Sequence, residues 1–180
     1  MRYQEVEATI AGLTSPQGPF PILNKVIDGS ERRVFGGLPD NLRDYYVSVG
    51  HYADKDCLVE QDRRYSFTDV LRQAASLSHS LAGRYGVKKG DRVAIAMRNA
   101  PEWCISFMAV TALGAVAVPM NSWWQGEELV YGLKDSGASL VILDGTRFAR
   151  MADWLRDQDL PVIGVDTGGA PLPEDIDRLE

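Results

Sequence analysis

The chain contains little cysteine and little histidine. Its 180 residues include two of each, at Cys57, Cys104, His51 and His79. Disulfide frameworks and zinc sites need more such residues at set spacings, so we expect neither a disulfide-stapled fold nor a metal site. Two unpaired thiols packed in secondary structure are typical of a protein in the reducing cytoplasm, which is the location we expect.

Positive charge is also scarce. Nineteen Lys and Arg residues stand against twenty-five Asp and Glu residues, which gives a net charge of −6. The basic residues occur as scattered short pairs, such as Lys88-Lys89, rather than as a patch, so nucleic-acid binding is not expected. No apolar stretch follows the first five residues, and we therefore expect no secretory signal.

One long stretch lacks charge and resembles a membrane-spanning segment. From Trp103 to Met120 the chain carries no charged residue, which reaches the usual length of a transmembrane helix. Gly114 and Pro119 interrupt this stretch, and the valines between them are typical of a short buried strand. The sequence therefore predicts a helix followed by a strand, and no transmembrane segment.

The first 55 residues are expected to form an N-terminal extension. An Asp28-Gly29 pair between two apolar runs is a signal for a tight hairpin turn, and Asp40 or Asn41 can cap a helix. The expected elements are a helix at 2–13, strands at 22–27 and 32–35, and a second helix that continues from the cap through residue 49.

Residues 56–166 are predicted to form a parallel α/β domain. Strands at 57–60 and 64–66 lead to a helix that Ser66 and Asp69 can cap, and this helix carries one apolar face. Strands at 92–97, 115–119, 139–143 and 162–165 then alternate with helices at 101–113, 127–135 and 146–156. This alternation predicts the α/β class, a partial doubly wound parallel sheet with helices on its faces.

Residues 167–180 are rich in glycine, proline and acidic residues, and are expected to be a linker or a cut end. A sheet that is incomplete at such an end can leave an apolar edge uncovered. Self-association into a homo-oligomer would cover it.

The loops after the parallel strands are the expected places for ligands, because α/β sheets bind beyond the carboxyl ends of their strands. The loop from Arg98 to Pro101 has no glycine, and the chain has no phosphate-binding G-x-x-x-x-G-K-[ST] sequence. Asp144-Gly145-Thr146 is superficially similar to a strand end of phosphoryl-transferring hydrolases, but Ile142 occupies the nucleophile position. The residues by themselves therefore identify no catalytic group.

A resemblance to a known family does identify a function. Residues 86–103, GVKKGDRVAIAMRNAPEW, closely resemble the first parallel strand and helix of adenylate-forming acyl-CoA synthetases. GAVAVPMN at 114–121, EEL at 127–129 and KDSGA at 134–138 follow in that family's order and spacing, and YSFTDV at 65–70 resembles its Y-T-Y-x-E-L segment. The resemblance covers residues 54–144.

This resemblance implies a two-step ligase reaction for the parent protein. ATP and a carboxylate give an acyl-adenylate, with Mg²⁺ balancing phosphate charge, and the CoA thiol then displaces AMP. The segment at 121–129 is similar to a tryptophan-pair variant of fatty-acyl-CoA ligases, which favours a fatty or other hydrophobic carboxylic acid as substrate. A fatty or aromatic carboxylic acid and CoA are therefore the partners expected of the parent protein. Asn121, Trp123 and Trp124 are then expected on the substrate or interdomain surface.

The family's phosphate loop T-S-G-T-T-G-x-P-K-G, its ribose-binding aspartate and its C-terminal catalytic lysine have no counterpart in residues 1–180. The resemblance therefore supplies no catalytic residue, and the chain alone is expected to bind no cofactor and to be inactive without the remainder of the synthetase. Some relatives use arginines near the segment of Arg147 and Arg150 to meet the CoA phosphates. The alternative is that both are ordinary exposed helix arginines.

A second function class stays open. The chain can instead be a non-catalytic α/β interaction module that uses its hairpin and the Trp123-Trp124 loop as a contact surface, since adjacent exposed tryptophans are often binding hot spots. A reading frame that continues beyond residue 180 into a Ser/Thr/Gly-Lys loop favours the ligase, and one that stops at residue 180 favours the interaction module.

Overall fold

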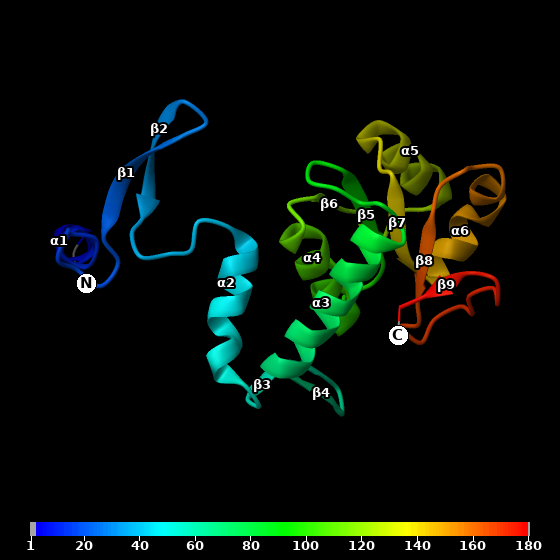
Figure 1. The fold of residues 1–180 in the computed structure, drawn as a ribbon, viewed down its shortest axis with the longest axis horizontal. Coiled ribbons are helices and arrows are strands. Elements are labelled where there is room, and N and C mark those ends of the chain that lie inside the picture. Colours follow the sequence, from blue (N-terminus) through cyan, green and yellow to red (C-terminus); the bar gives the residue numbers. More distant parts are fainter. Residues whose placement is uncertain (1–2, 180) are drawn as a thin grey trace. The chain divides into compact units, whose positions relative to one another are not determined.

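The computed structural model describes residues 3–179, and the chain divides after Asn41 into two compact units. The first unit contains α1 (Tyr3–Leu13) and the strands β1 (Ile22–Ile27) and β2 (Ser30–Phe35). Figure 1 labels these elements along the chain. None of the described residues of this unit is buried. Local hydrogen bonds, rather than a packed core, therefore hold its elements in shape.

The hairpin of the first unit confirms the turn signal in the sequence. β1 and β2 pair antiparallel in a register from Ile22↔Phe35 to Ile27↔Ser30. Asp28 and Gly29 both have positive φ, 49° and 77°, as a two-residue type I′ turn requires. Because this turn is so tight, the second strand begins at Ser30 rather than at the expected residue 32. The expected helix start at Arg2 lies outside the described residues.

The second unit begins with two helical segments and a short hairpin. α2 (Leu42–Ser48) runs into the 3₁₀ helix η1 (Val49–Tyr52), and β3 (Asp56–Glu60) pairs with β4 (Arg63–Ser66). α3 (Phe67–Gly83) follows, and its predicted capping box is present: the Asp69 N–H donates to Ser66 Oγ at 3.1 Å, and the Ser66 N–H donates to Asp69 Oδ2 at 3.2 Å. Its buried residues are the four that the helical spacing predicts, Val70, Ala74, Leu77 and Leu81.

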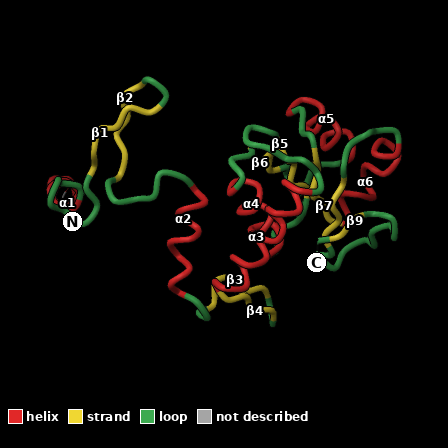
Figure 2. Tube along the Cα trace, viewed as in Figure 1, coloured by secondary structure: helices red, strands yellow, loops and turns green. Residues whose placement is uncertain are grey.

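The predicted parallel sheet is confirmed, and Figure 2 shows its alternation of helices and strands. Its strands are β5 (Arg92–Ala96), β6 (Val116–Pro119), β7 (Leu140–Asp144), β8 (Val162–Val165) and β9 (Asp177–Arg178), in the order β6-β5-β7-β8-β9. The connecting helices are α4 (Pro101–Ala112), α5 (Gly126–Ser136) and α6 (Gly145–Arg156). Every neighbouring pair of strands is parallel.

Both faces of this sheet are buried, which makes it doubly wound. Val93 and Ile95 of β5 pack in one core cluster with residues of α3 and α4. Ala94 and Ala96 face the other way, into a cluster with residues of α5 and α6. Strand residues that alternate between two apolar cores are typical of a parallel sheet covered on both sides.

Two expected boundaries change in ways that affect the site. β7 extends to Asp144 rather than ending at residue 143, because Asp144 still pairs in register with Val165 of β8. The tail is not wholly a linker: Asp177 and Arg178 form β9 and pair with Ile163 and Gly164. A two-residue strand in a segment rich in glycine and proline has no periodicity that a sequence could reveal.

The uncharged stretch divides as expected. α4 ends at Ala112, Gly114 adopts a left-handed φ of 74°, and β6 follows. Within residues 3–179, no helix is both long enough and apolar enough to cross a bilayer.

Candidate functional site

A buried aspartate connects several segments at the edge of the parallel sheet where the strands end. Asp144 ends β7 and is 1% exposed. Its Oδ1 accepts from the Arg147 backbone N–H at 3.0 Å, and its Oδ2 accepts from the Arg98 backbone N–H at 2.9 Å and from Arg147 Nη1 at 2.9 Å. The Thr167 hydroxyl donates to Oδ2 at 3.4 Å. These bonds offset the cost of burying the charge and connect the ends of β5 and β7 to the segment after β8.

Arg147, which is bound to Asp144, also holds the loop after β6. Its Nε donates to the Ser122 carbonyl at 3.1 Å, and its Nη2 contacts the same oxygen. Arg147 is 9% exposed, so the alternative of an ordinary exposed helix arginine is wrong for this residue. Arg150, one turn later and partly buried, donates from Nη1 to the carbonyls of Trp124 at 2.7 Å and Ser122 at 3.4 Å. A contact of either arginine with CoA stays a prediction.

The loop that these arginines hold carries the tryptophan pair, and the structure separates its two members. Asn121 Oδ1 accepts from the Trp123 backbone N–H at 3.0 Å, and Trp123 is 83% exposed. Trp124 is partly buried against the core cluster of α5 and α6. A Cβ placed on Gly132 of α5 would lie 2.9 Å from the Trp124 ring and 3.0 Å from Met120 Sδ. Trp124 is therefore a packing residue, and Trp123 is available for contact.

A chain of charges, which the sequence did not reveal, begins at Arg98, whose backbone N–H donates to Asp144. Arg98 Nε donates to the Thr167 carbonyl at 3.0 Å, and its Nη2 pairs with Glu60 Oε1 at 3.0 Å. Glu60 also pairs with Arg63 at 3.6 Å, and Arg63 contacts Glu102 at the start of α4. Partial burial works against the charged Arg63 guanidinium, but hydrogen bonds to Glu102 and a tyrosine raise its pKa overall. The network fixes the β3–β4 hairpin to the end of β5.

The segment after β8 closes over the beginning of α6. A Cβ on Gly145 would lie 1.7 Å from the Ala170 carbonyl oxygen, and one on Gly169 would lie 2.6 Å from Thr146 Oγ1. Two glycines therefore permit a backbone approach that other residues would block. Gly145 stands in the Asp144-Gly145-Thr146 segment, and the structure shows that Asp144 caps α6.

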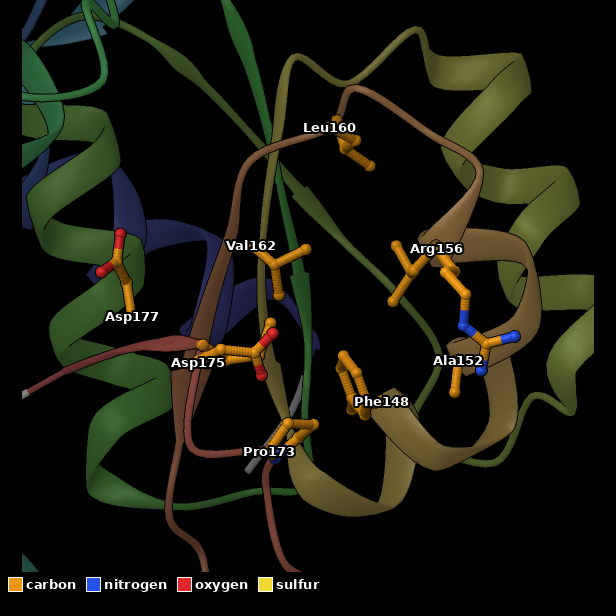
Figure 3. Close-up of a pocket in the computed structure, with 10 residues that line it drawn as sticks. Phe148, Ala152, Arg156, Leu160, Val162, Pro173, Asp175 and Asp177 are labelled. Carbon is orange, nitrogen blue, oxygen red and sulfur yellow. The ribbon is translucent and has the colours of Figure 1, made fainter.

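A pocket of about 530 Å³ lies between α6, β8 and the segment at 173–177. In Figure 3 its apolar wall is formed by Phe148, Leu160 and Val162, with Arg156 on α6 and Asp175 on the opposite segment. Arg156 and Asp175 lie on separate walls rather than converging on one point, and Asp177, the third charged lining residue, is bonded to Arg84 and Tyr85. The pocket therefore lacks the cluster of polar groups that reaction chemistry requires.

The two cysteines are free and partly buried. Burial raises the pKa of both thiols, and the nearby Cys104 raises that of Cys57 further. Cys104 lies in the first turn of α4 and is partly exposed, so it is less fully packed than the sequence predicts. Among residues 3–179, no group of three His, Cys, Asp or Glu side chains could hold a metal ion.

Known proteins share this fold and sequence. A family model described as AMP-binding enzyme matches residues 46–178. Crotonobetaine/carnitine–CoA ligases of Salmonella paratyphi B and Salmonella typhimurium are each 29% identical over 151 residues, which cover 79% of this chain and 28% of the relative. The chain thus spans little more than a quarter of the length of these curated relatives.

Solved structures give the same result. The anthranilate CoA ligase AuaEII, in complex with anthranoyl-AMP, is similar with a TM-score of 0.69 and 26% identity over 78% of this chain and 27% of that chain. A protein assigned as a long-chain-fatty-acid CoA ligase from Rhodopseudomonas palustris has a TM-score of 0.67 and 25% identity, and the match covers 77% of this chain and 35% of that one.

Proposed function

The chain belongs to the AMP-binding enzyme family, and from this premise we propose that it is the N-terminal portion of an ATP-dependent, AMP-forming acid–CoA ligase. In the proposed reaction a carboxylate oxygen attacks the α-phosphorus of ATP, pyrophosphate leaves, and the CoA thiol then displaces AMP from the acyl group. ATP, Mg²⁺ and CoA are assigned to the parent protein. We propose that this chain alone is inactive and acts with the remainder of the ligase.

The observation that supports this role best is the anchoring of the loop at 121–125. Parallel α/β sheets bind ligands beyond the carboxyl ends of their strands, where this loop lies. Asp144 and Arg147 are committed to each other and to the backbone of neighbouring segments, so neither is free to act as an acid, a base or a nucleophile. The network therefore holds a surface in place, and the reacting groups come from elsewhere.

We propose that this surface meets the acyl chain of the substrate or the rest of the ligase through Trp123. Trp123 is 83% exposed, and its indole ring on an anchored loop offers apolar area at little entropic cost. The names of the relatives refer to crotonobetaine, carnitine, anthranilate and long-chain fatty acids, which are all carboxylic acids. A fatty or aromatic acid is the substrate that an exposed indole favours. Unpaired Cys57 and Cys104 support the cytoplasm as the location.

The matched experiment compares two exposed aromatic residues in the longer protein that contains this chain. Trp123→Ala is expected to raise KM for a long-chain acid several-fold and to leave adenylation of short acids in place. Tyr131→Ala, on α5 and 66% exposed, is the control and should change neither. Equal effects of both substitutions on all acids would contradict a role for the loop at the acyl surface.

The exposure of Trp123 also supports the alternative function, a non-catalytic interaction module. The hairpin of the first unit presents further apolar side chains, with Val26 75% and Phe35 54% exposed. The reading frame downstream of residue 180 separates the two functions. Continuation into the phosphate loop supports the ligase, and a stop codon there supports the module.

A further inference from the structure

Three helices of the second unit enclose an open apolar groove. α2, α3 and α4 supply its lining, and its volume is about 740 Å³. Small-molecule sites typically have volumes of roughly 300–1,000 Å³. The groove is lined by helices and includes none of the strand-end residues described above.

Small side chains and one hydrogen bond keep this groove open. Ala75, Ser78 and Ala82 follow one another on α3 at spacings of three and four residues, so they lie on one helical face. On the other side, Tyr46 of α2 is joined to Thr111 of α4 by a hydrogen bond of 2.9 Å between their hydroxyl oxygens. This bond holds α2 against α4, while the alanines of α3 leave the space between the helices unfilled.

The charges in the groove all have one sign. Its charged lining residues are Arg43 and Arg72, its other titratable lining residues are Tyr46 and His79, and no acidic side chain is among its lining residues, although the whole chain has a net charge of −6. Arg43 pairs with the neighbouring Asp44 at 3.3 Å, and both side chains are exposed. Arg72 pairs with Asp69 on its own helix at 2.8 Å, and both side chains are exposed. Such an exposed pair contributes only about 0–1 kcal/mol, and a guanidinium has five N–H donors, so Arg72 can also bind an added anion.

We propose that this groove binds one free long-chain carboxylate. The alkyl chain lies against Leu71, Ala75 and Met108, and the carboxylate meets Arg72 at the rim. An apolar slot with a cationic rim is complementary to this amphiphile in both shape and charge. A second copy of the chain is disfavoured, because a two-fold contact would place the arginine rim against itself. The proposal is independent of the ligase activity.

The test uses the complete 180-residue chain and dodecanoate below its micelle concentration, titrated calorimetrically without ATP or CoA. We expect saturable binding to one site, and at least about tenfold weaker binding of dodecyltrimethylammonium, which has the same chain length and the opposite charge. Ala75→Trp fills the slot, and Arg72→Glu reverses the charge at the rim. Each is expected to weaken dodecanoate binding about tenfold or more, the loss that corresponds to one charge-assisted hydrogen bond.

Arg156→Glu is the matched control. Like Arg72, Arg156 pairs with an aspartate three residues earlier on its helix. The Arg156 side chain is 73% exposed and the Arg72 side chain 71%. Arg156 lies at the α6 pocket of Figure 3, so its substitution should change the dissociation constant less than twofold. Melting curves check each variant. If Ala75→Trp fails to fold, Arg72→Glu decides the matter, because its side chain is exposed.

Four results would overturn the proposal. The first is the absence of saturable dodecanoate binding, and the second is a loss of affinity on Arg156→Glu equal to that on Arg72→Glu. The third is binding to phosphatidylglycerol vesicles without binding of dodecanoate monomers. The fourth is a concentration-dependent dimer that Ala75→Trp abolishes while dodecanoate does not bind.

Discussion

Removal of the Asp144 carboxylate tests how the loop at 121–125 is held. In Asp144→Ala, the Arg147 guanidinium, whose side chain is 11% exposed, loses its ion-pair partner, and α6 loses its cap. A buried charge without its partner costs about 3–5 kcal/mol, and a lost cap costs about 1 kcal/mol. The two costs overlap, because the same carboxylate makes the ion pair and the cap. We expect the free energy of unfolding to fall by about 3–5 kcal/mol. Asp144→Asn keeps a capping oxygen and should cost less, about 1–3 kcal/mol.

Urea unfolding followed by tryptophan fluorescence is the suitable assay, because all four tryptophans lie after residue 100 and report on the second unit alone. Asp153→Ala is the control. Asp153 pairs with Arg156 on the same helix at the same three-residue spacing, but it is 97% exposed, so its loss should cost less than about 0.5 kcal/mol. An Asp144→Ala loss below about 1 kcal/mol would refute the buried-network reasoning.

A double-mutant cycle separates the ion pair from the other bonds of Asp144. Arg147→Met removes the guanidinium and keeps much of its apolar stem. If Asp144 and Arg147 act as a pair, the double variant should lose less stability than the sum of the single losses, by about 1–3 kcal/mol. Additive losses would show that the carboxylate acts through Arg98 and the helix cap alone.

The remaining predictions concern other side chains. Trp124→Ala should lower the free energy of unfolding by about 2–3 kcal/mol because its ring packs against the core, whereas Trp123→Ala should lower it by under about 0.5 kcal/mol. Equal losses in urea unfolding would contradict the assignment of Trp124 to packing and Trp123 to contact. Burial and the hydrogen bond to Asp177 raise the pKa of Tyr85 from 10.0 to about 12, so its contribution to stability is complete below pH 10 and is lost as the pH rises towards 12. Alkaline melting curves of Tyr85→Phe should lack this loss, and curves that match the parent chain would disprove it. Because burial raises the pKa of Cys104, a thiol reagent at pH 8 should label it slowly in the native chain and rapidly in urea, and rapid native labelling would show that α4 is uncovered there.

The sequence predicts most of the fold because its signals are local. The helix from Phe67 begins with the capping box formed by Ser66 and Asp69. Its buried face follows from the helical spacing of its apolar residues Val70, Ala74, Leu77 and Leu81. Gly114 likewise divides the uncharged stretch where its left-handed φ requires a residue without a Cβ. Each of these features depends on residues that lie close together along the chain.

The candidate site was only partly predictable because it depends on which strands are neighbours. Asp144 reaches the Arg98 backbone N–H because β7 lies next to β5, although β6 comes between them in the sequence. No residue pattern indicates that order. The division of the tryptophan pair depends on Gly132 of the following helix α5, which leaves room for the Trp124 ring, and no periodic pattern marks that contact.

ATP–pyrophosphate exchange tests most directly whether this chain is the N-terminal portion of an acid–CoA ligase. We predict no exchange by the 180-residue chain with fatty or aromatic acids. The protein extended through its downstream reading frame should show exchange with at least one such acid, followed by formation of its CoA thioester. Exchange by the chain alone that is absent from a mock preparation, or an extended protein that activates no carboxylic acid, would contradict the proposal.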